Sequence, residues 1–87
     1  MDEFEKNHED AIKKASRKKL IKALYYCEEY SSGRIYSDDE YVDKEEKNRY
    51  RKLKAKALEY IDILNRVKKI DFQTKKEIYD FARGWFE

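Results

Sequence analysis

The sequence predicts an all-α protein in which a long antiparallel helical hairpin carries a short third helix packed across it, as in a three-helix bundle. Three observations favour this fold. The 87-residue chain contains no proline and only two glycines, whereas sheet folds need frequent turn residues. Apolar side chains recur at helical spacing over most of the chain. Charged residues make up 46% of it, so the remainder supplies one small core and a single domain over residues 1–87.

The first predicted helix runs from Asn7 to Tyr30. Its apolar residues fall on one half of a helical wheel, so this side is expected to face the core. The residues are Ile12, Ala15, Leu20, Ala23, Leu24, Tyr26, Cys27 and Tyr30. Gly33 is the predicted stop, because glycine is favoured just beyond a helix C-terminus.

The second predicted helix extends from Asp38 to about Lys69. Ser37 and Glu40 have the spacing of a capping box, and Tyr36 and Tyr41 have that of a hydrophobic staple. Apolar residues then alternate at steps of three and four: Tyr50, Leu53, Ala57, Tyr60, Leu64 and Val67. This spacing leaves self-association open, but alanine and tyrosine are poor coiled-coil seam residues, so a monomer is favoured.

The third predicted helix is short and begins at a second capping box, formed by Thr74 and Glu77. Five apolar residues then cover one of its sides: Ile78, Phe81, Ala82, Trp85 and Phe86. Such a stripe is expected to fold back over the hairpin. The alternative is that it forms a docking surface for a partner.

Charge is strongly segregated along the chain. Residues 13–22 and residues 47–56 each carry six basic side chains and no acid, whereas residues 28–46 carry eight acids and two bases. A turn near Gly33 and Arg34 would place the two basic blocks side by side. The hairpin is therefore predicted to have a basic waist and an acidic tip.

Catalysis is not expected, and neither a cofactor nor a metal site is predicted. His8 is the only histidine; it follows Glu5 at the spacing of a di-iron ligand pair, but a second pair is lacking. Cys27, the only cysteine, is expected to be a buried apolar residue. A single cysteine in so small a domain favours a reducing compartment. No apolar run is long enough to span a membrane, and the protein is predicted to be cytoplasmic.

The main functional hypothesis is a non-enzymatic regulator or inhibitor that binds another protein with a basic surface. Its predicted binding residues surround the hairpin tip: Arg34, Ile35, Tyr36, Asp38, Asp39, Glu40, Tyr41 and Asp43. An acidic helical tip can occupy a basic groove intended for nucleic acid. The chain is also rich in residues with AT-rich codons, a composition common in phages and mobile elements. A phage-type inhibitor of a host nucleic-acid-handling or defence protein is the most specific form of this hypothesis.

The alternative is a small nucleic-acid-binding protein that uses the basic waist. Its predicted contacts combine basic side chains, which would bind phosphates, with an aromatic side chain, which would stack on a nucleobase. They are Lys14, Lys18, Lys22, Tyr25, Lys47, Arg51 and Lys54.

Overall fold

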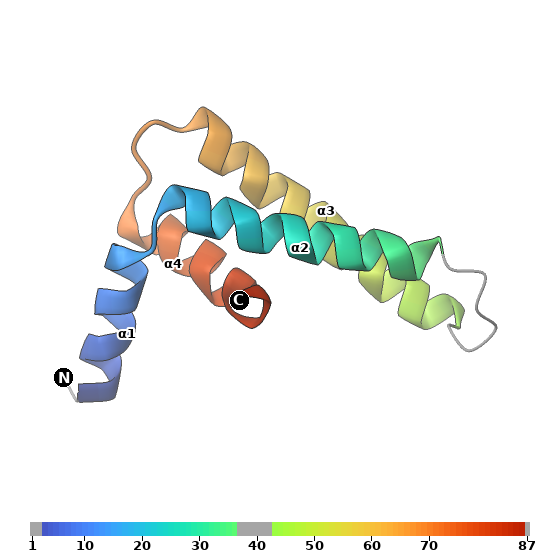
Figure 1. Cartoon of the computed structure of the whole chain (residues 1–87), viewed down its shortest axis with the longest axis horizontal. Coiled ribbons are helices and arrows are strands. Elements are labelled where there is room, and N and C mark those ends of the chain that lie inside the picture. The colour runs from blue at the N-terminus through green and yellow to red at the C-terminus, as the bar shows by residue number, and fades with distance from the viewer. Residues whose placement is uncertain (1–2, 37–42, 87) are drawn as a thin grey trace.

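The computed structural model describes residues 3–36 and 43–86. Within these ranges the chain forms four α-helices and a closing 3-10 turn: α1 (Glu3–Lys14), α2 (Arg17–Ile35), α3 (Lys44–Arg66), α4 (Phe72–Ala82) and η1 (Arg83–Trp85). Helices α2 and α3 pack as an antiparallel hairpin, α4 and η1 lie against α2, and α1 diverges from the hairpin to contact α4 (Figure 1). The all-α hairpin with a short helix across it is confirmed, with one more helix than predicted.

The predicted single helix from Asn7 to Tyr30 is wrong, because the chain breaks between α1 and α2. Ser16 has extended backbone angles (φ −75°, ψ 154°) and caps α2, its hydroxyl accepting a hydrogen bond from the Lys19 backbone N–H at 3.0 Å. Serine competes with the helix for backbone donors and is favoured at a helix start. The break lets α1 turn away from the hairpin.

Helix α2 continues through Gly33, so the predicted stop there is also wrong. The last backbone hydrogen bond of the helix runs from the Tyr36 N–H to the Ser32 carbonyl at 3.0 Å. Neither glycine in the described chain has a positive φ. The left-handed conformation that makes glycine a helix terminator is therefore not used at this position.

Helix α3 begins at Lys44, later than the predicted start at Asp38. Asp43 caps it by accepting a hydrogen bond from the Glu46 N–H at 2.8 Å. The predicted capping box of Ser37 and Glu40, together with Tyr41, falls outside the described residues. The helix is unbroken to Arg66, and Val67, placed in its apolar seam by the sequence, lies beyond it and is exposed.

Helix α4 is capped by Asp71 and not by Thr74, which corrects the second predicted capping box. The Asp71 carboxylate accepts a hydrogen bond from the Thr74 N–H at 2.7 Å. Thr74 is therefore the third residue of the helix. A carboxylate is a strong N-cap because its charge also complements the helix dipole.

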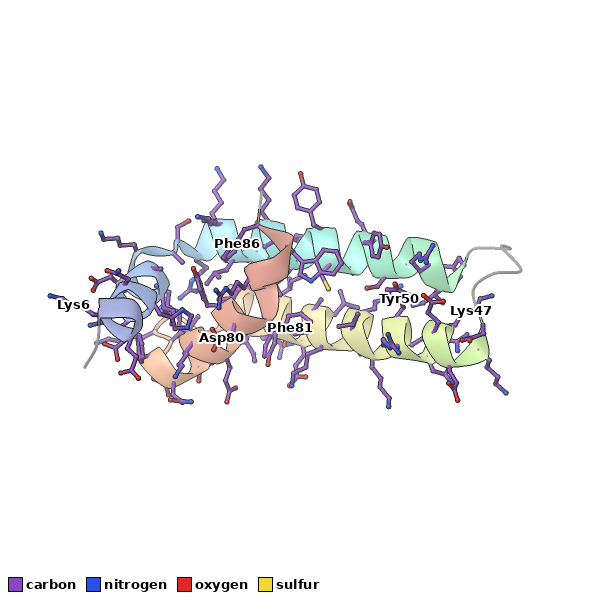
Figure 2. The ribbon with its side chains drawn as sticks, turned by 90° about the horizontal axis from the view of Figure 1, so that it is seen from below. Lys6, Lys47, Tyr50, Asp80, Phe81 and Phe86 are labelled. Carbon is purple, nitrogen blue, oxygen red and sulfur yellow. The ribbon has the colours of Figure 1, made fainter. Side chains whose placement is uncertain are left out.

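The core lies where α2, α3 and α4 meet. Its buried residues are Ala15, Leu20, Ala23, Leu24, Cys27, Ala57, Tyr60, Ile61, Leu64, Ile78 and Ala82. Tyr60 of α3 and Phe81 of α4 meet edge to face with ring centroids 5.3 Å apart. Lys47 and Tyr50 lie at the end of the hairpin that α4 does not reach (Figure 2).

The register of the hairpin differs from the predicted one. The Tyr30 and Tyr50 ring centroids are 5.8 Å apart, and Arg34 Nη2 lies 3.6 Å from Glu46 Oε1. A turn at Gly33 would have placed Tyr30 beside residue 38. Because α2 runs on to Ile35 and α3 starts only at Lys44, the turn comes about seven residues later along the chain.

This register overturns the predicted charge layout. Arg17, in the first basic block, contacts the carbonyl oxygens of Leu64 and Val67 at the C-terminal end of α3. The second block lies beside the later half of α2, where Lys54 Nζ is 3.8 Å from Glu28 Oε1. The two basic blocks are therefore at different ends of the hairpin and do not form one waist.

Candidate functional site

The outward side of α2 carries three exposed tyrosines. Tyr25, Tyr26 and Tyr30 are 47%, 38% and 50% exposed. Tyr26 and Tyr30 were expected in the core stripe, so this is a correction: they sit at the edge of the helix where α4 and η1 only partly cover it. Three lysines, Lys18, Lys19 and Lys22, share this side. We call these six residues the tyrosine–lysine face.

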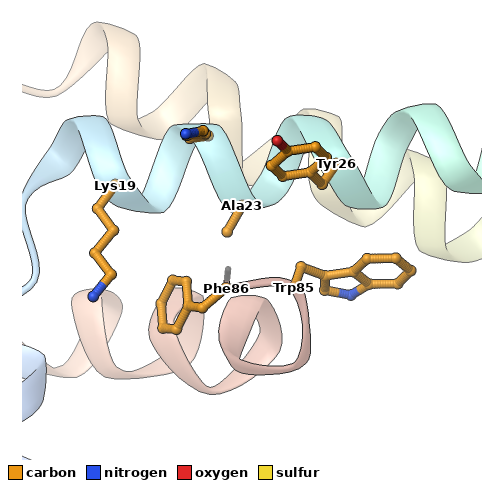
Figure 3. Close-up of a pocket in the computed structure, with 6 residues that line it drawn as sticks. Lys19, Ala23, Tyr26, Trp85 and Phe86 are labelled. Carbon is orange, nitrogen blue, oxygen red and sulfur yellow. The ribbon is translucent and has the colours of Figure 1, made fainter.

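A cleft opens where this face meets the C-terminal turn. It consists of two adjoining hollows of about 230 and 270 Å3 that share Tyr26, Trp85 and Phe86. The first hollow is completed by Lys19, Lys22 and Ala23, and the second by Tyr30 and Gly84. Figure 3 shows Lys19 on the Phe86 side of the first hollow, with Tyr26 and Trp85 at its other side. We call this feature the C-terminal cleft.

Aromatic contacts order the walls of the C-terminal cleft. The Trp85 and Tyr30 ring centroids are 5.4 Å apart, and Lys19 Nζ lies 5.1 Å from the Phe86 ring centroid. A lysine at that distance is attracted to the ring face. The cleft thus presents flat apolar surfaces with positive charge on its rim, which suits a ligand that combines apolar or planar groups with negative charge.

A separate groove, which we call the distal groove, lies on the hairpin near the end of α2. Its volume is about 320 Å3 and it is lined by Ile35, Tyr36, Arg51, Lys54, Ala55 and Leu58. Ile35 and Tyr36 belong to the predicted protein-binding set, whereas Arg51 and Lys54 belong to the predicted nucleic-acid set. The tertiary structure therefore brings parts of two separately predicted surfaces together.

The remaining residues of the predicted acidic tip have structural partners or lie outside the described chain. Asp43 caps α3, and Arg34 pairs with Glu46 and lies 5.7 Å from the Tyr50 ring centroid. Asp38, Asp39, Glu40 and Tyr41 fall outside the described residues. The acidic tip is thus neither assembled nor excluded by the described contacts, and it stays a prediction.

The predicted nucleic-acid contacts divide into separate groups. Lys18, Lys22 and Tyr25 share a face of α2, whereas Lys14 is the last residue of α1, on the other side of the chain break. Lys47, Arg51 and Lys54 share a face of α3 near the distal end. Because the register separates these groups, they do not form one continuous basic surface.

Nine residues at the candidate sites were not proposed as site residues from the sequence. In the C-terminal cleft they are Lys19, Ala23, Tyr26, Tyr30, Gly84, Trp85 and Phe86, and in the distal groove they are Ala55 and Leu58. Leu58 is 44% exposed and lies off the apolar seam of its helix. This position outside the seam was the sequence signal that could have identified Leu58 as a surface residue. Trp85 and Phe86 were assigned to the core, with a docking surface as the alternative; both are half-buried.

The reactive side chains are engaged in packing. His8 Nε2 lies 3.0 Å from Asp80 Oδ1, which links α1 to α4. Cys27 is buried in the core as predicted, and this burial raises the pKa of its thiol. In residues 3–36 and 43–86 no group of three or more histidine, cysteine or acidic side chains could hold a metal ion. None of the helices in the same ranges is both long and apolar enough to cross a membrane.

Comparisons with known proteins find no relative. No protein family matches the sequence, and neither the curated proteins nor the solved structures contain a match. The function must therefore be inferred from the surface chemistry of the chain itself.

Proposed function

We propose that this protein is a non-enzymatic binding module that regulates another protein by docking through the tyrosine–lysine face and the C-terminal cleft. The observation that carries the proposal is the gathering of exposed Tyr26 and Tyr30 beside half-buried Trp85 and Phe86, with exposed Tyr25 next to them in α2. Tyrosine and tryptophan dominate the energetics of protein interfaces. Grouped apolar side chains on a small domain are typical of interaction sites.

The charges on this surface indicate the chemistry of the partner. Lys19 and Lys22 line the C-terminal cleft, and none of the described residues that line its two hollows is acidic. An acidic partner surface with an apolar anchor would complement it. This differs from the basic partner predicted for the acidic tip, and the two surfaces are separable by mutation.

The specific form of the proposal is an inhibitor that blocks a host protein involved in nucleic-acid handling or defence. It rests on the small size of the chain, its richness in amino acids that are specified by AT-rich codons, and its charged helical surface. An acidic partner site on such a host protein would be the target of the tyrosine–lysine face.

The test is affinity capture with a matched pair of glycine variants. A β-carbon at Gly84 or at Gly33 would meet no other atom within 4 Å, so each glycine can be replaced without a clash. Gly84→Glu places a negative charge in the C-terminal cleft. Gly33→Glu places the same charge outside the cleft, near the end of α2. The wild type and Gly33→Glu should capture one stoichiometric protein from a low-GC bacterial lysate after nuclease treatment. Gly84→Glu should lose it, and equal capture by both variants would refute the cleft as the site.

Nucleic-acid binding is the second candidate, favoured by Lys18, Lys22 and Tyr25 on one face of α2. Aromatic side chains that stack on nucleobases, placed beside basic side chains, are typical of proteins that bind single-stranded nucleic acid. Fluorescence anisotropy with a labelled oligothymidine should then show salt-dependent binding. Replacing Lys18 and Lys22 by alanine should weaken it and reduce the slope of log affinity against log salt by about 1.4. An unchanged slope would remove these lysines from consideration.

A further inference from the structure

We propose that the distal groove binds an acidic peptide segment of another protein, seating an aliphatic side chain on its floor and carboxylates beside Arg51 and Lys54. The groove shares no lining residue with the C-terminal cleft. The proposal is therefore independent of the function proposed above, and either can fail without the other.

The floor and wall of the groove are apolar and accessible. Ile35 is buried beneath it, and Leu58 of α3 and Tyr36 at the end of α2 are 44% and 75% exposed. Ala55 precedes Leu58 by three residues, so the two lie on the same face of the helix. Covering these side chains with an aliphatic group would remove apolar surface from water, which is the main favourable contribution to such contacts.

Arg51 supplies a pre-positioned donor at the rim of the groove. Its Nη1 donates a hydrogen bond to Asn48 Oδ1 at 2.7 Å. This bond uses one of the five N–H groups of the guanidinium. The planar group thus retains the capacity for two parallel hydrogen bonds to a carboxylate.

Lys54 is the second cation at the rim and is held between two neighbours. Its Nζ lies 5.3 Å from the Tyr36 ring centroid and 3.8 Å from Glu28 Oε1. Glu28 also accepts a hydrogen bond from the Ser32 hydroxyl at 3.0 Å. Glu28, the acid beside Lys54, thus already has two partners.

The charge of the described groove lining favours an anionic occupant. Among residues 3–36 and 43–86, two cations and no acid line the groove, and Lys47 extends the same face of α3 one turn further. Arg51 and Lys54 are three residues apart, which places them as neighbours on the helix surface. Carboxylates spaced three or four residues apart on a helical peptide would match them.

The apolar surface favours a peptide over a nucleic acid. Of the four uncharged residues that line the groove within the described part of the chain, three are aliphatic and Tyr36 is the one aromatic ring. Single-stranded nucleic acid is bound by successive aromatic platforms, which this groove does not offer. An open hollow on a hairpin surface would also leave a small metabolite largely in water, whereas ligand pockets bury most of their ligand.

The binding test is a titration of the 15N-labelled full chain with short synthetic helical peptides, followed by amide NMR shifts. The first peptide carries leucine on one face, flanked by glutamates three and four residues away. We expect it to shift the resonances of Tyr36, Arg51, Ala55 and Leu58. A matched peptide with serine for leucine, and one with lysine for glutamate, should bind about tenfold more weakly or not at all.

Two substitutions on α3 test the location. Ala55→Glu introduces a charge that repels the peptide at the groove floor, and Asn65→Glu introduces the same charge two to three turns away. Both positions are exposed, so the fold should survive, as checked by circular dichroism. Ala55→Glu should weaken peptide binding about tenfold and Asn65→Glu should leave it unchanged.

Three results would overturn the proposal. One is the absence of peptide-dependent shifts at the groove, and another is equal binding by Ala55→Glu and Asn65→Glu. The third is a labelled oligothymidine that shifts the groove resonances at lower concentration than the acidic peptide, which would assign the groove to nucleic acid.

Discussion

Arg17 closes the C-terminal end of α3, with its Nη1 atom donating a hydrogen bond to the Leu64 carbonyl oxygen at 2.8 Å. The same guanidinium donates to the carbonyl oxygens of Val67 at 2.6 Å and Lys68 at 2.9 Å. The last carbonyls of a helix have no partner within it, and a cation there also complements the helix dipole. The first residue of α2 is thus a side-chain cap for α3, 47 residues along the chain.

Loss of this cap should destabilise the hairpin. We expect Arg17→Ala to lower the free energy of unfolding by about 1–3 kcal/mol, because hydrogen bonds from a charged donor are lost. Arg17→Lys should retain only part of this stabilisation, since an ammonium group lacks the planar arrangement of N–H donors that the guanidinium has. Urea denaturation followed by circular dichroism measures the change. Lys18→Ala is the matched control, expected within about 0.5 kcal/mol of wild type; equal effects at both positions would show that the cap contributes nothing.

The break between α1 and α2 depends on the Ser16 hydroxyl. Ser16→Ala should cost about 1 kcal/mol of stability, as is usual for the loss of an N-cap. Ser16→Asp should keep the wild-type stability, because aspartate is an equally good cap. Thermal unfolding of the three proteins under one condition distinguishes them. The prediction is contradicted if the aspartate variant is as unstable as the alanine variant.

The cap of α4 should make stability depend on pH. Hydrogen bonds from the backbone and side chain of Thr74 hold the pKa of Asp71 below its usual value. A carboxyl with a lowered folded-state pKa contributes stability that is present above its unfolded-state pKa, and that is lost as pH falls through the folded-state pKa. When the pH is lowered below about 4, the Tm of the wild type should therefore decrease more steeply than the Tm of Asp71→Asn. Asp62→Asn is the control, and a profile for Asp71→Asn that matches wild type would refute the assignment.

Cys27 should be unreactive in the folded protein. Burial raises the pKa of its thiol, and the negative charge of Glu28 acts in the same direction. Because the thiolate is the reactive form, alkylation by iodoacetamide at neutral pH should be slow in buffer and rapid in denaturant. Mass spectrometry of timed samples measures it. Rapid modification of the native chain would place Cys27 at the surface.

The sites were only partly predictable for the same reason that the register was not. Tyr36, Arg51 and Lys54 were predictable from the sequence as surface residues with binding chemistry, but their positions in the chain assigned them to different surfaces. Their meeting depends on where the turn lies, and α2 continues past Gly33 to Ile35 with its helical hydrogen bonding intact as far as the Tyr36 N–H. Gly33 offered a local stop signal that the folded chain does not use, so the turn was placed too early.

Periodic apolar spacing was sufficient for the all-α class and for much of the core, including Leu20, Leu24, Leu64 and Ile78. Such patterns reflect local geometry, since one helix turn brings the same side chains together in any surroundings. The break at Ser16 is held by a local hydrogen bond from the Lys19 N–H, whereas the register and the cap from Arg17 arose only in the folded chain. These two features select among locally similar alternatives through contacts between residues distant in sequence, and the free-energy differences between those alternatives are set by packing. Charge segregation along the chain therefore became charge pairing across the hairpin, as in Lys54 with Glu28.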